Sequence, residues 1–320
     1  MKSVLLITAF IFLTIISSHA QEGKYSFKEQ YDISTPATLN ISLSDGDIKV
    51  YPGKDGNIEV FYSVYKENRF VNISKEELSK YVIIDVKHNR NLLDISIHQK
   101  KPVHWKNQYE VSVEVYTPVK SSCNLRSSDG DIFISGLNSD QKCITSDGDI
   151  KISKINGKLN LHTSDGDIDI SEILGDLELK TSDGDIIAKN VEGAARLITS
   201  DGDISLSNLT GAVGAKTSDG DIHARDCNGS MTAVTSDGDI RCNFLKVTNK
   251  VSLITSDGDI NASIPKDLSI NLKVKGETLR VPLVNFSGKT EEHHIEGTIN
   301  GGGIPVEIIT TDGTITLSYL

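Results

Sequence analysis

Residues 146–168 read SDGDIKISKINGKLNLHTSDGDI, one repeat followed by the start of the next, and this stretch decides the fold. The pentapeptide Ser-Asp-Gly-Asp-Ile occurs at 128–132, 146–150, 164–168, 182–186, 200–204, 218–222, 236–240 and 256–260; an isolated copy lies at 44–48 and a degenerate one at 311–315. The central glycines from Gly130 to Gly238 are 18 residues apart, and Gly258 follows after 20, which places a two-residue insertion near 244–249. Such a period is typical of stacked repeat units.

Apolar and polar residues alternate within each repeat. Ile150 and Ile152 follow one turn, Leu159 and Leu161 follow a second turn at Gly157, and a threonine closes the unit. Alternation with period two predicts β-strands. Two short strands and two turns in 18 residues make one coil of a β-solenoid, hydrogen-bonded to the next coil at about 4.8 Å.

We therefore predict an all-β fold, a β-helix-like solenoid of 18-residue coils with a cap at each end, because the open ends of a solenoid expose strand edges. The predicted segments are a signal peptide (1–20), an N-terminal β-rich region (21–120), the solenoid (121–275) and a C-terminal capping coil (276–320). In a central coil, Leu179 is expected inside the stack and Lys180 outside. Ser74-Lys-Glu-Glu77 predicts the start of one short helix in the N-terminal region.

The first twenty residues have the layout of a secretory leader. Lys2 precedes an apolar run from Val4 to Ile16, and Ser18-His19-Ala20 provides small residues before a cleavage site at Gln21. We expect an exported protein, located in the periplasm, on the outer-membrane surface or in the medium. Beyond residue 20 no apolar run is long enough for a membrane-spanning helix.

Composition argues against nucleic acid as a partner. The formal charge is −11, whereas a nucleic-acid binder needs a basic face. The sixteen Asp of the eight consecutive repeats account for the acidity, because the other acidic residues are outnumbered by the 33 Lys and Arg. The negative charge therefore belongs to one edge of the predicted rod.

The repeats, the strands that lead into Tyr116-Thr-Pro118 and the ending from Asn300 to Leu317 (NGGGIPVEIITTDGTITL) together resemble the bacterial exported "putative adhesin" domain family. The resemblance covers most of residues 40–320. It implies a β-solenoid in the cell envelope or outside the cell, and an adhesive role toward a protein or glycan ligand. The family offers no catalytic residues to transfer.

The Asp residues of the repeats, here called the Asp ladder, have two interpretations. In the structural one, the first Asp of each unit caps turn amides, Gly takes a positive φ, and the second Asp points into solvent. In the functional one, a calcium-binding repeat protein, Ca²⁺ associates weakly between coils and stiffens the rod. The candidate ligands are Asp129, Asp131, Asp147, Asp149, Asp165, Asp167, Asp183, Asp185, Asp201, Asp203, Asp219, Asp221, Asp237, Asp239, Asp257 and Asp259.

We expect no enzymatic activity and no other cofactor, because the outward positions of the coils do not repeat one chemistry and short coils leave no room for a groove. The alternative is a glycan-active hydrolase or lyase on a β-helix. It would need two carboxylates within about 5–10 Å in a groove. An ice-binding face is disfavoured because the threonine column, represented by Thr181, has inward parity.

Three smaller features have open interpretations. His293-His294 beside Glu291-Glu292 suggests a polar loop rather than a metal site, since the spacing suits neither a helix nor one strand face. Trp105 either anchors a turn or stacks on a sugar ring. Among the cysteines, Cys123 and Cys143 are too far apart for a disulfide in ideal geometry, whereas Cys227 and Cys242 flank one corner on adjacent coils and are better placed.

Overall fold

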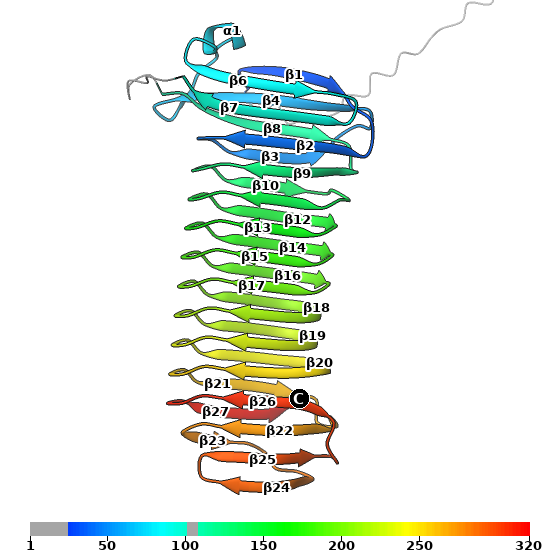
Figure 1. The fold of residues 1–320 in the computed structure, drawn as a ribbon, viewed down its shortest axis with the longest axis vertical. Helices are drawn as coiled ribbons and strands as arrows, with labels where there is room; N and C mark the ends of the chain where they lie inside the picture. Colours follow the sequence, from blue (N-terminus) through cyan, green and yellow to red (C-terminus); the bar gives the residue numbers. More distant parts are fainter. Residues whose placement is uncertain (1–24, 101–107) are drawn as a thin grey trace, which may run out of the picture.

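In the computed structural model, which describes residues 25–100 and 108–320, the chain winds into a long rod of stacked coils (Figure 1). Each central coil adds one strand to each of two faces, and successive strands pair in parallel. The faces meet at two corners. The ladder corner carries the Ser-Asp-Gly-Asp turns, and the second corner lies between the two strands of one coil. The β-solenoid prediction is confirmed.

The first face holds fourteen strands, which follow in spatial order from the N-terminal end. They are β1 (Phe27–Asp32), β4 (Asn57–Lys66), β8 (Glu110–Thr117), β3 (Ile48–Pro52), β10 (Ile132–Ser135), β12 (Ile150–Asn156), β14 (Ile168–Leu174), β16 (Ile186–Glu192), β18 (Ile204–Lys216), β19 (Ile222–Val234), β20 (Ile240–Ile254), β21 (Ile260–Ile264), β27 (Thr314–Tyr319) and β23 (Thr278–Arg280).

The second face is built in the same way, and β18, β19 and β20 continue around the second corner into it. Its other strands are β6 (Val82–His88), β7 (Leu92–Gln99), β2 (Ala37–Leu43), β9 (Ser121–Arg126), β11 (Gln141–Ile144), β13 (Leu159–His162), β15 (Leu177–Lys180), β17 (Ala195–Ile198), β26 (Ile304–Ile309), β22 (Ile270–Lys275), β25 (His294–Ile299) and β24 (Phe286–Glu291).

Side chains sort by parity as the alternation predicts. Leu179 is 1% exposed and its neighbour Lys180 is exposed, which confirms the expected orientation. The threonine column is buried as well: the Thr181 hydroxyl donates to the carbonyls of Ser164 and Gly166, at 3.1 and 3.0 Å. Each buried hydroxyl is thereby satisfied, and the column is not an exposed ice-binding face.

The N-terminal cap changes strand direction. β4 pairs antiparallel with both β1 and β8, and β6 pairs antiparallel with β7, so the parallel stack ends in antiparallel pairs. Next to them lies α1 (Lys75–Leu78), where the Ser74 side chain accepts the Glu77 amide, as the capping motif predicts (Figure 1). β5 (Arg69–Phe70) closes a hairpin with β4. No helix of the described segments is long and apolar enough to cross a bilayer.

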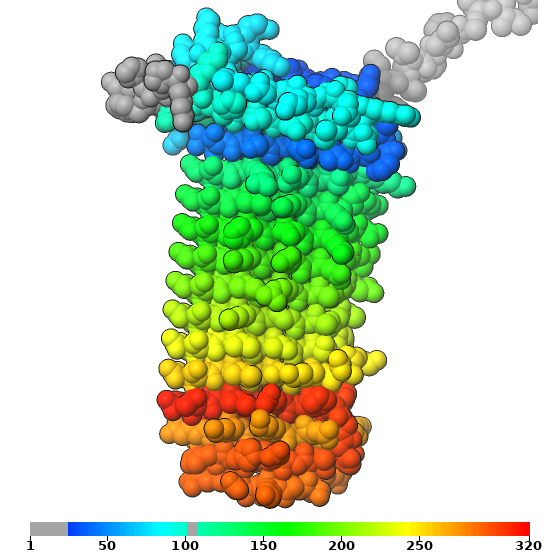
Figure 2. All heavy atoms as spheres, in the orientation of Figure 1, coloured from blue at the N-terminus to red at the C-terminus, as the bar shows by residue number. Residues whose placement is uncertain are grey.

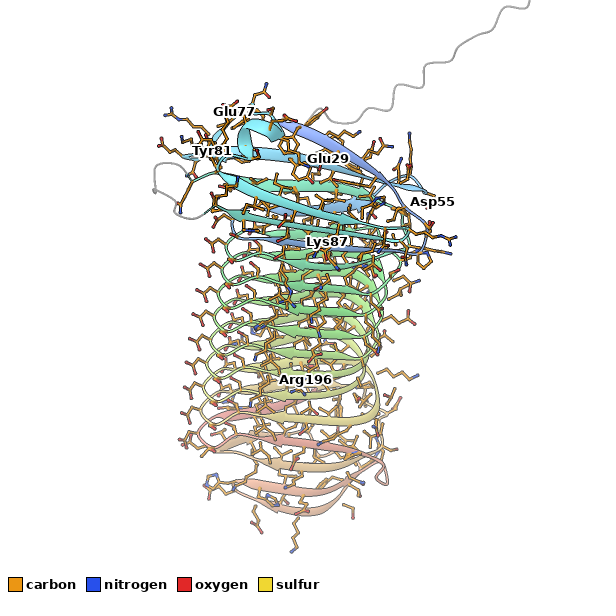
Figure 3. All side chains as sticks on the ribbon, turned by 45° about the horizontal axis from the view of Figure 1, so that its top comes forward. Glu29, Asp55, Glu77, Tyr81, Lys87 and Arg196 are labelled. Carbon is orange, nitrogen blue, oxygen red and sulfur yellow. The ribbon has the colours of Figure 1, made fainter. Side chains whose placement is uncertain are left out.

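A network of hydrogen bonds and one ion pair, centred on Glu29, connects the elements of this cap. The Glu29 carboxylate accepts from Tyr31 and Tyr62 at 2.7 and 3.0 Å and pairs with Lys75 at 2.5 Å. Burial alone would raise the pKa of Glu29, but the hydrogen bonds from Lys75 and the two tyrosines outweigh it and lower that pKa. The network therefore favours an ionised Glu29 and links α1 to β1 and β4. Figure 3 shows Glu29 at this end of the rod.

The stack is longer than the segment 121–275, because the two outlying copies of the repeat join it. Ile48 pairs with Ile132, so the copy at 44–48 forms the first rung although more than eighty residues separate it from the second. At the other end, β26 lies between β20 and β22, and β27 lies between β21 and β23. The last coil of the chain is thus inserted between two earlier ones (Figure 2, red between yellow and orange).

The repeat glycines are required by close contact rather than by a positive φ, so the expectation of φ > 0 is wrong for Gly130 to Gly258. Of the ladder-corner glycines, only Gly46 lies in the left-handed region, with φ 111°. A Cβ on Gly184 would lie 2.0 Å from the carbonyl oxygen of Gly166, and the other repeats give similar values. Any side chain at this position would hold neighbouring coils apart.

At the second corner, five successive coils each place one non-glycine residue in the left-handed region. Lys154, Glu172, Asn190, Asn208 and Asp226 have φ between 55° and 58°. Asn and Asp tolerate this region better than Lys or Glu. The predicted insertion lies near this corner on the next coil, since Gly229 pairs with Val247 and Met231 with Val251.

Replacing Gly184 by Ala is expected to lower the free energy of unfolding by about 3 kcal/mol or more, because the clash is with backbone on the adjacent coil. Gly214→Ala is the matched control: it lies on β18, and its new Cβ would meet nothing closer than the Ala195 carbonyl oxygen at 3.9 Å. Denaturant melts of both variants test this. Equal stability of the two would contradict the close-contact explanation.

Candidate functional site

The Asp ladder runs along the ladder corner, the left-hand edge of the rod in Figure 3, as two columns with different roles. In the second column, each carboxylate accepts the backbone amide of the corresponding Asp one rung further. Oδ1 of Asp167 accepts from Asp185 N at 2.8 Å, and Oδ1 of Asp185 accepts from Asp203 N at 2.8 Å. The chain of bonds continues from Asp47 to Thr314. It joins ten rungs along the axis of the rod.

The first column does none of this. Asp183 is exposed, and only its backbone amide is bonded, to the Ser164 carbonyl at 3.0 Å. The structural interpretation had the two positions reversed. The correction has a geometric reason: the second Asp is the residue whose side chain lies directly over the amide of the next coil, so it caps between coils and not within its own turn.

Cations two residues along the strand offset part of the repulsion in the second column. Lys151 lies 2.9 Å from Asp149 and Arg241 lies 2.9 Å from Asp239, because residues i and i+2 share a strand face. Burial raises the pKa of Asp149, but the Lys151 hydrogen bond and the accepted amide more than compensate and lower it. The same pair raises the pKa of Lys151.

At the N-terminal end of the ladder, acids lie near one another instead. Burial raises the pKa of Asp45, and the charge of Asp129 raises it further. Burial also raises the pKa of Glu110, with contributions from the charges of Asp47 and Asp45. Asp45 and Glu110 are therefore easier to protonate than free carboxylates.

Substitutions at Asp185 and Asp183 test whether the two columns differ in their contribution to stability. Asp185→Ala removes the acceptor for the Asp203 amide and is expected to lower the free energy of unfolding by about 1–2 kcal/mol. Asp185→Asn keeps an oxygen acceptor and removes a like charge, so it should retain most of the stability. Asp183→Ala is the matched control and should be neutral or slightly stabilising at low salt. Thermal melts that rank Asp183→Ala below Asp185→Ala would contradict the assignment.

The ladder carboxylates form columns and not chelating clusters. Among residues 25–100 and 108–320, no group of three or more His, Cys, Asp or Glu side chains is placed to hold a metal ion. One oxygen of each second-column carboxylate is already engaged by an amide. Weak calcium association along the columns stays a prediction.

Its test is a pair of thermal melts, with millimolar Ca²⁺ and with chelator, supported by calorimetry at low salt. Calcium association predicts a higher melting temperature with the ion and measurable heat of binding. Identical melting temperatures with no heat would leave the ladder as turn chemistry alone.

The two histidines lie where the turn after β24 meets β25: His293 is in the turn, and His294 is the first residue of β25. His293 contacts the Glu277 carbonyl at 2.9 Å, and His294 contacts Glu296 at 3.2 Å. These contacts agree with a polar loop. Trp105, the other candidate from the sequence, lies outside the described residues.

All four cysteines are buried free thiols, so neither of the two pairs considered from the sequence, including the better placed Cys227 and Cys242, is bridged. The register between β19 and β20 shifts at this corner: Cys242 is opposite Ala224, and Cys227 is opposite Phe244. The Cys242 thiol instead contacts the Met231 sulfur at 3.7 Å. Burial raises the pKa of Cys227 to about 11 and that of Cys123 to about 12, so these thiols stay protonated and act as core residues.

An outward strip of aromatic rings is the feature that sequence reasoning missed. Phe61 on β4, Tyr116 on β8, Tyr51 on β3 and Phe133 on β10 point away from the core, and Tyr25 adjoins Phe61. Successive ring centroids lie 5.0 to 5.7 Å apart from Tyr25 to Phe133. The sequence held a signal: no Phe, Tyr or Trp occurs between residues 134 and 243, so the aromatic residues concentrate at the N-terminal end.

The second corner carries a shallow groove of about 560 Å³. The left-handed residues Lys154, Glu172, Asn190 and Asn208 line it, and the amides of Asn190 and Asn208 are joined at 2.8 Å. Leu174 is 52% exposed at its side. Mixed charges and amides along this groove single out no ligand class.

Comparison with known proteins agrees with this geometry. A family described as Toastrack DUF4097 matches residues 36–318. A crystal structure described as a "putative adhesin" from Parabacteroides distasonis is similar, at 16% identity and a TM-score of 0.51, over 75% of this chain and 98% of that one. One from Parabacteroides merdae with the same description has 16% identity and a TM-score of 0.44, over 75% and 97% of the two chains. No protein of curated function matches the sequence.

Proposed function

The chain belongs to the Toastrack DUF4097 family, and on that premise we propose that it is a non-catalytic, exported rod that serves in the cell envelope or at the cell surface as an adhesion or scaffold element. The observation that carries the proposal is the uninterrupted stack from Gly46 to Gly313. Each rung is bonded to the next by strand pairing on both faces, by the threonine hydroxyls and by the second Asp column. Such a stack supports a stiff spacer.

The distribution of residues between the inside and the outside of the rod supports a binding role rather than catalysis. Most inward positions hold apolar residues or hydrogen-bonded threonines, with Gln141 and a few serines as the polar exceptions. In the part of the chain that the structure describes, none of the buried side chains is charged, so acid–base chemistry is left to the outward positions. These positions change from rung to rung, as a contact surface allows. Catalysis would instead need an acid and a base that converge on one substrate atom.

The leader and a structural neighbour support the location and the role. Residues 1–20 have the layout of an export signal. The Parabacteroides distasonis protein that shares the fold is described as a "putative adhesin". An adhesion or scaffold element outside the cytoplasm accounts for both.

The location is tested by intact mass spectrometry and fractionation of the chain made in its native host. The mature product is expected to begin at Gln21 and to leave the cytoplasm. Leu13→Arg, which interrupts the apolar run, is the control and should accumulate inside with residues 1–20 attached. A wild-type product that keeps these residues and stays in the cytoplasm would contradict export.

The adhesive role is tested in the same preparation with beads that carry the mature chain. We expect these beads to be retained on envelope fractions of the host or of neighbouring cells, whereas beads that carry serum albumin are not. Equal retention of the two kinds of bead would overturn the adhesive role.

A further inference from the structure

We infer that the strip formed by Tyr25, Phe61, Tyr116, Tyr51 and Phe133 is a docking surface for an uncharged glycan chain that lies along the axis of the rod. The inference rests on the proposed adhesive function and names the class of ligand. It is carried by the geometry of the rings, by their exposure and by the charge around them.

The rings form one continuous line across the strands. Tyr51 stacks on Tyr116 with centroids 5.6 Å apart, and Phe133 is tilted against Tyr51 at 5.3 Å. On the other side, Phe61 meets Tyr116 edge to face at 5.7 Å and Tyr25 meets Phe61 at 5.0 Å. Because the line crosses the hydrogen-bonded strands, it follows the rod axis over four strand spacings, about 20 Å in all.

The strip is not part of the core. Neighbours on the same strands point inward and are buried, as Val60 and Tyr62 do beside Phe61, whereas Tyr25 is 46% exposed and the other four rings are partly exposed. Further along the same face, Lys151 and Ser153 occupy the positions that Phe133 and Ser135 hold. Because later coils fold with polar residues at these positions, the outward rings are not needed to bury the core. A contiguous exposed apolar patch marks an interaction surface.

Basic and acidic side chains both border the strip, and the two lysines form ion pairs with carboxylates. Lys28 pairs with Glu59 at 2.6 Å, and its ammonium lies 4.8 Å from the centre of the Phe61 ring. Glu114 accepts the Tyr116 hydroxyl at 2.7 Å, and Lys49 lies beside Tyr51 on β3. Lys49 is itself paired with Asp47 at 3.6 Å, so the groups at the border carry no excess of positive charge, which disfavours a polyanion. Burial and Glu114 raise the pKa of Tyr116 to about 12, so its hydroxyl keeps its proton at neutral pH.

A neutral sugar chain meets both requirements of this surface. A pyranose ring offers polarised C–H groups to the electron-rich part of an aromatic ring, and its hydroxyls donate to carboxylates and accept from ammonium groups. The rings are spaced at the interval of the strands, which is close to the length of one sugar residue. Neighbouring ring planes differ by 75° and 79° at the Tyr25–Phe61 and Phe61–Tyr116 contacts and by 28° between Tyr116 and Tyr51, so a chain laid along the axis meets ring edges and ring faces in turn.

The test is affinity electrophoresis of the mature chain in gels that contain hydroxyethylcellulose, xylan or mannan, with polygalacturonate as the anionic comparison. We expect at least one neutral polysaccharide to retard the wild-type chain more than polygalacturonate does. The double variant Tyr51→Ser, Phe133→Ser should bind at least about tenfold more weakly, since two ring contacts are lost. Ile187→Ser, at the same register on β16, is the control and should bind as the wild type does.

Thermal melts of the wild type and of each variant show whether the variants are folded. Tyr51→Phe, with Phe133 intact, keeps both rings and should retain binding. Wild-type retardation that the double variant preserves would overturn the inference, as would the absence of retardation by any neutral polysaccharide. If wild-type beads still attach to envelope fractions in either case, the adhesive function stands and the ligand is of another class. Concentration-dependent dimers in light scattering that only the double variant lacks would assign the strip to a second copy of the chain.

Discussion

The approach of backbone to backbone at the ladder corner is the constraint on which the rest of the rod depends. At each repeat glycine, a Cβ would lie only about 2 Å from the carbonyl oxygen of the glycine on the preceding coil, so the coils reach strand-pairing distance at this corner because glycine stands there. The threonine hydroxyls, the Ser carbonyls and the second Asp carboxylates then reach their partners on the adjacent coil without adjustment. Repetition of one turn therefore sets the register of both faces.

That register also explains why an acidic edge is compatible with stability. Stacked like charges repel, by about 0.9 kcal/mol per neighbour in water at this spacing. Each second Asp, however, gains a charge-assisted bond to a backbone amide that has no other partner in its turn. Three rungs add a cation, Lys49, Lys151 or Arg241, two residues along the strand, and His223 lies at the corresponding position beside Asp221. The acidity of the chain is therefore part of its turn chemistry.

The repeat predicted the strands, the parity of Leu179 and Lys180 and the buried threonines because period-two alternation and a constant spacing leave little freedom. Roles within the turn were harder to predict. Whether a carboxylate bonds within its own coil or to the next depends on which side chain lies over the amide of the adjacent coil, and spacing along the chain does not encode that. The aromatic strip was missed for another reason: its members come from positions 25, 51, 61, 116 and 133 and become neighbours only when β8 pairs with both β3 and β4.

The insertion of β26 and β27 between older coils determines the order in which the molecule can be completed. The coils from β9 to β21 are stacked in the order of the sequence, but β22 and β23 leave a gap that residues 304–319 fill. A product cut short by even one strand keeps two unpaired sheet edges inside the rod. The pairing of the inner edges of β20, β21, β22 and β23 therefore depends on residues 304–319, which follow all four strands in the sequence.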